Sequence, residues 1–139
     1  MGSTRGTTIY GVEEQVNRTN TLAVATTLTN SDSGKVFTLS ATTGKVITLP
    51  SVAIDGFNAK FVVGSAFATT NFTVVAPTQV IQGGAIVNSV FVPAGNENTI
   101  SFVASAETIG DYIDIVSDGT NYYVSGAGAL AGSITFTAV

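Results

Sequence analysis

Short runs of β-branched and aromatic residues, separated by Gly, Pro, Asn and Asp, recur along this chain from about residue 34 to its end. Within most runs apolar and polar residues alternate, which is the period of a strand with one buried face. No run has the 3.6-residue period of an amphipathic helix, and strong helix formers are few. The pattern therefore excludes a helical fold and favours an all-β one.

About eight to ten such runs follow one another at a spacing of about 8–12 residues, which is typical of sandwiches and barrels. We therefore predict an all-β fold: a single antiparallel β-sandwich or barrel, jelly-roll-like, with an extended N-terminal arm. We place the arm, rich in Thr and Asn, at residues 1–30 and the sandwich or barrel domain at residues 31–139. An arm of this composition is either disordered or ordered against a neighbouring molecule.

The segment from Asp111 to Gly126, DYIDIVSDGTNYYVSG, has the strongest local signal. Its two β-rich halves flank an Asp-Gly pair, and Gly adopts the positive φ of a tight turn without a Cβ clash. We predict a β-hairpin with Ile113 and Ile115 on its buried face.

Four further runs belong to the predicted strand pattern. Residues 34–39 and 44–49 are near copies, GKVFTL and GKVITL, and form either a hairpin or two successive strands with matched faces. Residues 86–92 are predicted to form one strand that ends at Pro93. The C-terminal run Ser133–Val139 is predicted to be a last strand and a candidate for pairing between subunits.

Charge is sparse: five Lys and Arg oppose nine Asp and Glu, for a net charge of −4. The five cations are scattered, so we expect no nucleic-acid partner. No apolar run is long enough for a membrane helix and the N-terminus lacks a signal-peptide pattern, so we expect no membrane partner either. A surface this neutral is either a contact for another protein or the Thr/Ser/Asn-rich surface of a soluble monomer.

The residue types needed for most catalysis are missing. The chain has no His and no Cys, which removes the usual general base, the Ser-His-Asp arrangement and the common transition-metal sites. It also lacks a phosphate-binding loop and a dinucleotide fingerprint. We therefore predict that the chain is not an enzyme, with no catalytic, cofactor-binding or metal-binding residues and no cofactor.

Two groups of residues have the chemistry of a functional site, and each also has a purely structural interpretation. Asp111, Asp114 and Asp118 are close in sequence, so a carboxylate pair for glycoside hydrolysis or Ca²⁺ is conceivable, but turn and surface positions are favoured. Tyr112, Tyr122 and Tyr123 suggest a sugar-stacking platform, but Tyr122 and Tyr123 point to opposite faces of a strand. Core packing and a cross-strand pair are favoured for them. Glu13 and Glu14 are expected to be solvated or to contact Arg5 or Arg18 of a neighbour.

The segment Ile115–Val124, IVSDGTNYYV, resembles a hairpin that recurs in virion proteins of tailed bacteriophages, in tail fibres and in capsid decoration (cement) proteins. In those proteins Trp is usual where Tyr122 stands here. The segments GKVITLP at 44–50, FTV at 72–74 and IQG at 81–83 are similar as well, so the resemblance covers about residues 34–126. The hairpin is structural in such families, so the resemblance carries over no active site.

The resemblance, with the short one-domain chain, implies a structural virion protein on the capsid exterior. As a decoration protein it would bind the major capsid protein through its arm and associate with itself as a homo-oligomer, with a trimer as the expected number. The alternative is a short tail-fibre or adhesin module that binds a host surface glycan, and it requires an exposed aromatic cluster around Tyr112 and Tyr122. A depolymerase enzyme is a third and weaker hypothesis.

Overall fold

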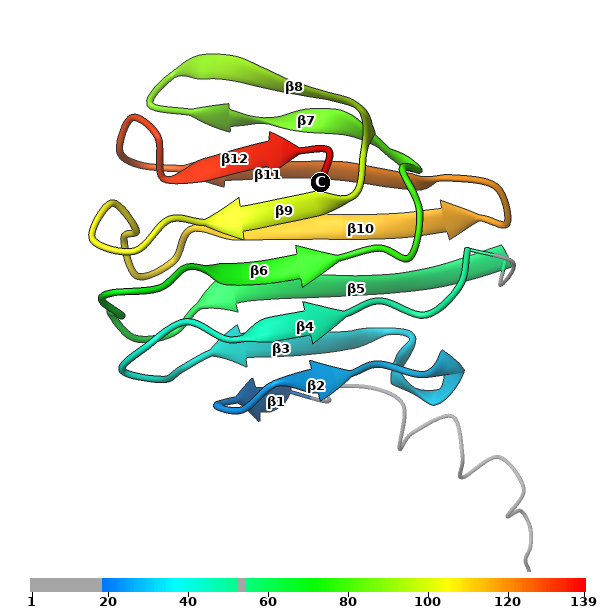
Figure 1. Cartoon of the computed structure of the whole chain (residues 1–139), viewed down its shortest axis with the longest axis horizontal. Helices are drawn as coiled ribbons and strands as arrows, with labels where there is room; N and C mark the ends of the chain where they lie inside the picture. The colour runs from blue at the N-terminus through cyan, green and yellow to red at the C-terminus, as the bar shows by residue number, and fades with distance from the viewer. Residues whose placement is uncertain (1–18, 53–54) are drawn as a thin grey trace, which may run out of the picture.

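The computed structural model describes residues 19–52 and 55–139, and these form two β-sheets packed face to face (Figure 1). The described residues contain twelve strands. The seven-stranded sheet has the order β1 (Thr19–Leu22), β3 (Lys35–Leu39), β5 (Asp55–Val63), β10 (Tyr112–Asp118), β11 (Tyr122–Gly128), β7 (Ile81–Val87) and β8 (Val90–Glu97). The five-stranded sheet has the order β12 (Ile134–Thr137), β9 (Thr99–Phe102), β6 (Phe72–Val75), β4 (Val46–Thr48) and β2 (Thr26–Thr27). The predicted all-β sandwich is confirmed.

In the first half of the chain, successive strands alternate between the two sheets. Strands β1, β3 and β5 lie in one sheet and β2, β4 and β6 in the other, so each successive strand passes from one sheet to the opposite one. Neighbours within each sheet are therefore parallel, because the chain has reversed twice between them. Both sheets therefore contain parallel as well as antiparallel pairs of strands, which corrects the purely antiparallel sandwich that the sequence pattern predicts.

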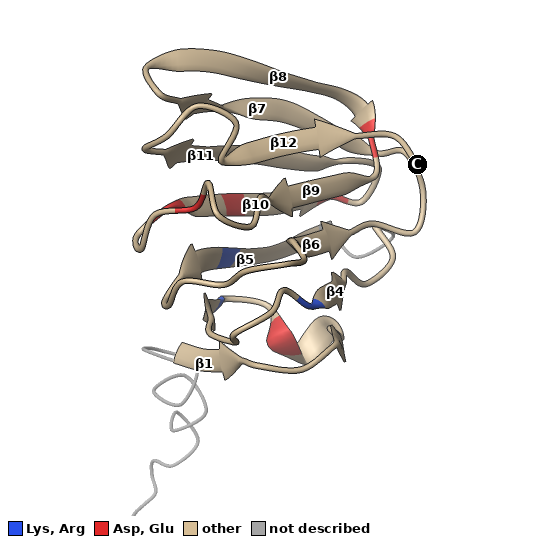
Figure 2. Cartoon of the chain, turned by 60° about the vertical axis from the view of Figure 1, so that its left-hand side comes forward, with Lys and Arg blue, Asp and Glu red and all other residues tan. Residues whose placement is uncertain are grey.

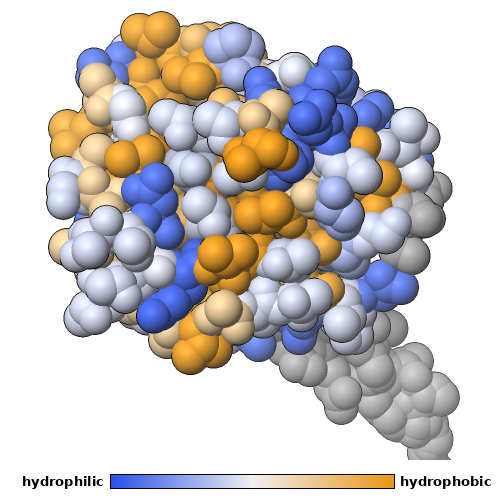
Figure 3. Space-filling view, viewed as in Figure 1, coloured by the Kyte–Doolittle hydropathy of each residue, from blue (hydrophilic) through white to orange (hydrophobic). Residues whose placement is uncertain are grey.

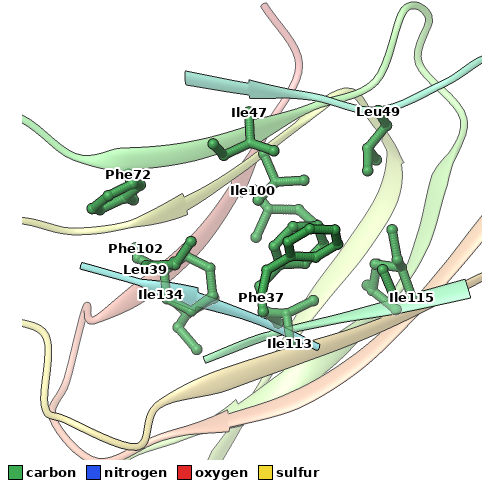
Figure 4. Packing of buried hydrophobic residues seen from close by; sticks show 14 of the residues in the cluster. Phe37, Leu39, Ile47, Leu49, Phe72, Ile100, Phe102, Ile113, Ile115 and Ile134 are labelled. Atoms are coloured by element: carbon green, nitrogen blue, oxygen red, sulfur yellow. The ribbon is translucent and has the colours of Figure 1, made fainter. Parts of the chain in front are cut away.

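The duplicated segments are two successive strands with matched faces, which was one of the two predicted alternatives. They are β3 and β4 and lie in opposite sheets. Phe37 and Leu39 point into the core from one side, and Ile47 and Leu49 point in from the other; all four are almost completely buried (Figure 4). The repeat thus places the same apolar pattern on both walls of the core.

The second half of the chain is built from hairpins, and the predicted hairpin is confirmed. Strands β10 and β11 pair antiparallel with Ile115 opposite Val124. Gly119 in the connecting turn has a φ of 88°, the conformation for which Gly was expected. Ile113 and Ile115 are buried, and β10 lies between β5 and β11 in the middle of the larger sheet.

The core is continuous between the sheets and consists of aliphatic and aromatic side chains (Figure 4). The rings of Phe37 and Phe61 stack with centroids 5.5 Å apart, and Phe67 meets Phe72 edge to face at 5.0 Å. These geometries are the favourable ones for aromatic pairs.

One predicted strand is wrong. Residues 86–92 do not form a single strand, because Asn88 and Ser89 adopt positive φ values of 51° and 66° and reverse the chain between β7 and β8. Strand β8 then continues through Pro93, where the sequence pattern predicted an end. Pro is tolerated there because β8 is an edge strand of its sheet.

The predicted boundary at residue 30 is also corrected by the structure. Strand β1 pairs with β3, strand β2 pairs with β4, and Leu22 and Leu28 are buried in the core. Residues 19–30 therefore belong to the sandwich. Residues 1–18, the rest of the predicted arm, lie outside the described residues.

Candidate functional site

Asp111 is a buried brace between two parts of the chain. Its Oδ2 accepts a hydrogen bond from the Thr108 N–H at 2.9 Å, and its Oδ1 accepts one from the Ala129 N–H at 3.0 Å. The sequence placed this residue correctly before its strand but gave no sign of its burial. Both carboxylate oxygens are occupied by backbone donors, so Asp111 ties the loop before β10 to the end of β11.

Asp118 forms the turn of the central hairpin. Its Oδ1 accepts hydrogen bonds from the N–H groups of Thr120 and Asn121, both at 2.8 Å, and its Oδ2 accepts one from the Tyr123 hydroxyl at 2.9 Å. The backbone donors of Asn121 and Thr120, followed by the Tyr123 hydroxyl, lower the pKa of this carboxyl. This is the turn role that the sequence predicted.

The three carboxylates do not form a site. Asp111 and Asp118 lie at opposite ends of β10, about 20 Å apart for seven residues of extended chain. Asp114 lies between them on the outer face of the sheet, in register with Lys60 and Ser125. The carboxyl pair of a glycosidase is separated by less than about 10 Å. Among residues 19–52 and 55–139, no cluster of three or more acidic residues could hold a metal ion.

The tyrosines are separated as well, and Tyr122 and Tyr123 do point to opposite faces. Tyr122 is fully buried, meets Phe57 edge to face at 6.2 Å, and donates its hydroxyl hydrogen bond to the Pro50 carbonyl. Burial raises the pKa of Tyr122 to about 12. Tyr123 is exposed on the outer face.

Tyr112 has one ring face covered by a neighbour. The Lys60 Nζ lies 4.4 Å from the centroid of its ring, in a cation–π contact between β5 and β10. A sugar would have to displace this ammonium group or use the other ring face. The described residues therefore do not bring the three tyrosines together as a stacking platform.

The described part of the chain encloses no pocket. None of its helices is long and apolar enough to cross a membrane. The predicted contacts of Glu13 and Glu14 with Arg5 or Arg18 concern residues outside the described ranges.

An apolar surface at the free edge of the larger sheet is the feature that sequence analysis missed. It consists of Ile86, Val90, Phe91 and Leu130, all about half exposed or more, and we call it the β8 patch. Figure 3 shows apolar side chains gathered over this end of the molecule. The signal in the sequence is Asn88-Ser89. If these residues form a hairpin turn, the apolar residues on either side of them lie on both faces of the hairpin.

Comparison with protein-family models, with curated proteins and with solved structures found no match to this chain.

Proposed function

We propose that this chain is a structural virion protein of a tailed bacteriophage: a decoration protein that binds the outside of the major capsid protein shell and stabilises it. The observation that carries the proposal is the β10–β11 hairpin, whose sequence resembles those of phage virion proteins. Its polar residues serve the fold: Ser117 and Asp118 bind the turn, and the Tyr122 hydroxyl binds a core carbonyl. This use agrees with the structural role that such hairpins have in those proteins.

The neutral surface of the sandwich further supports a role in assembly. A decoration protein acts in many copies, so weak contacts at each copy add up through avidity and require no catalytic group. We propose that the chain is a homo-oligomer on the capsid exterior and is not an enzyme. Its partner would be the major capsid protein, contacted through the N-terminal arm.

The glycan-binding alternative has less support. It requires an exposed aromatic cluster around Tyr112 and Tyr122, but Tyr122 is buried and Tyr112 is covered on one face by Lys60. Tyr112 and Tyr123 are the two aromatic rings that this hairpin presents on its outer face; Tyr112 is half-buried beneath Lys60, and the Tyr123 hydroxyl is bound to Asp118.

The arm proposal is tested by a deletion that spares the sandwich. Removing residues 2–18 leaves β1, which begins at Thr19 and pairs with β3. The truncated protein should keep the unfolding midpoint of the full chain and should no longer co-sediment with shells that lack the decoration protein. A full-length variant with residues 2–18 in scrambled order is the matched control for length and composition. Undiminished co-sedimentation of the truncated protein would refute the arm as the shell contact.

A further inference from the structure

The first half of β8 is exposed on both of its faces. Val90 pairs with Val87, which is buried, so Val90 lies on the core side of the sheet. Phe91 pairs with Ile86 on the outer side. Nevertheless Val90 is 62 % exposed and Phe91 is 56 % exposed. Since β8 is also the last strand of its sheet, the apolar surface wraps around a free edge.

Two contacts position this surface. The Asn88 N–H donates to the Gly128 carbonyl at 2.9 Å, which joins the β7–β8 turn to the end of β11, close to Leu130. The Phe91 ring lies over Gly84: a Cβ at that position would be 2.6 Å from the Phe91 Cζ. The absence of a side chain at Gly84 thus lets the ring lie against the strand.

The part of the sandwich around the β8 patch carries almost no charge. Residues 61–96 and 119–139 contain no Asp, Glu, Lys or Arg, and these ranges include β7, β11, β12 and β8 up to Asn96. In Figure 2 this side of the molecule is tan except at the end of β8, where Glu97 lies, while the other charged residues within the described ranges lie on or near β3, β4, β5 and β10. A chain with a net charge of −4 repels its own copies. Two copies meet at the lowest electrostatic cost through this uncharged side.

We propose that the β8 patch is the surface through which copies of this chain associate, with the patches of the copies meeting at the symmetry axis. The inference rests on the proposed function, which requires a homo-oligomer, and it identifies the surface through which the copies contact one another. An axis of symmetry brings identical residues together, and an apolar, uncharged surface is suited to contact with itself. Phe91 is the bulkiest side chain of the patch, which suits an anchor residue at such an interface.

The first test is the mass of the protein in solution. We expect the full chain to have a mass that is a multiple of the 14.1 kDa chain in light scattering coupled to size-exclusion chromatography. Phe91→Asp should reduce it to a single chain at the same concentration, with an unchanged circular dichroism spectrum. Val46→Asp is the matched control, because Val46 is 50 % exposed on β4 in the other sheet and receives the same charge; this variant should keep the wild-type mass.

A second test uses the absence of Cys from the chain. Phe91→Cys keeps the surface uncharged and places a single thiol at the proposed axis. A short bis-maleimide reagent should then convert the protein to covalent dimers, seen under denaturing conditions, whereas Val46→Cys should stay monomeric. Equal crosslinking of the two variants would contradict the assigned surface.

Two results would overturn the proposal. One is a monomeric wild-type protein at micromolar concentration. The other is a Phe91→Asp variant that keeps the wild-type mass; if that variant also no longer co-sediments with shells, the patch contacts the shell protein instead. Failure of the proposed function gives a different result, because there the wild-type oligomer itself does not bind shells.

Discussion

Tyr122→Phe removes one hydroxyl that joins the two sheets and leaves the ring in place. The Tyr122 side chain is fully buried, and its hydroxyl donates to the carbonyl of Pro50, next to β4 in the opposite sheet. Phe fills the same space, so no cavity forms and the contact with Phe57 is kept. What is lost is a hydrogen bond, and the half-buried Pro50 carbonyl loses its partner. The expected cost is about 1–2 kcal/mol of the free energy of unfolding.

Urea denaturation followed by circular dichroism measures this cost. With a urea dependence of about 1–2 kcal/mol per molar for a domain of this size, the midpoint should fall by roughly 1 M at an unchanged slope. The control is Tyr123→Phe, which removes the neighbouring hydroxyl from an exposed position and should cause a smaller shift. Equal shifts for the two variants would refute the bridge between the sheets as a source of stability.

Three further predictions use the same urea assay. Because burial raises the pKa of Tyr122 from 10.0 to about 12, the unfolded chain loses this proton first as the pH rises. The stabilisation is complete below pH 10 and lost towards pH 12, so the wild-type midpoint should fall over this window more steeply than that of Tyr122→Phe. Gly126→Ala would place a Cβ 2.2 Å from the Tyr112 carbonyl oxygen and should cost about 1–3 kcal/mol, whereas Gly95→Ala, with open space around it, should change the midpoint little. Asp111→Asn puts an amide NH₂ against the Thr108 or Ala129 N–H and should cost about 1–3 kcal/mol; a wild-type midpoint would contradict the brace.

The elements that sequence predicts well are those set by neighbouring residues. The β10–β11 hairpin follows from Asp118-Gly119 and the alternation on either side, and these residues form the observed turn and buried face. The inward residues of β3, β4, β6 and β9 follow from the same period of two. The opposite directions of Tyr122 and Tyr123 need no more than their adjacency in a strand.

The elements that sequence does not predict depend on contacts between distant residues. Alternation gives a buried face but not the sheet to which a strand belongs, so the winding of β1 to β6 between two sheets was not foreseen. Pro93 was interpreted as a strand end because the edge position that tolerates it is a property of the whole sheet. The burial of Asp111 depends on a segment distant in sequence, because the Ala129 N–H that binds its Oδ1 follows the second strand of the hairpin.

The sequence does not predict the β8 patch either, because its exposure also depends on contacts between distant residues. Ile86, Val90 and Phe91 have the composition of a core strand. Val90 and Phe91 are exposed because β8 is the last strand of its sheet, and Ile86, on the neighbouring strand β7, is exposed on the outer side opposite Phe91. Exposure of an apolar strand at an edge is a property of the assembled sandwich, and it is what makes the patch a candidate interface.

The copy number of this chain in purified virus particles tests the proposed function most directly. Quantitative mass spectrometry against the major capsid protein gives the ratio of the two chains. A decoration protein should be present in numbers comparable to the shell protein. A few copies per particle would indicate a tail component instead, and absence from particles would contradict a virion role altogether.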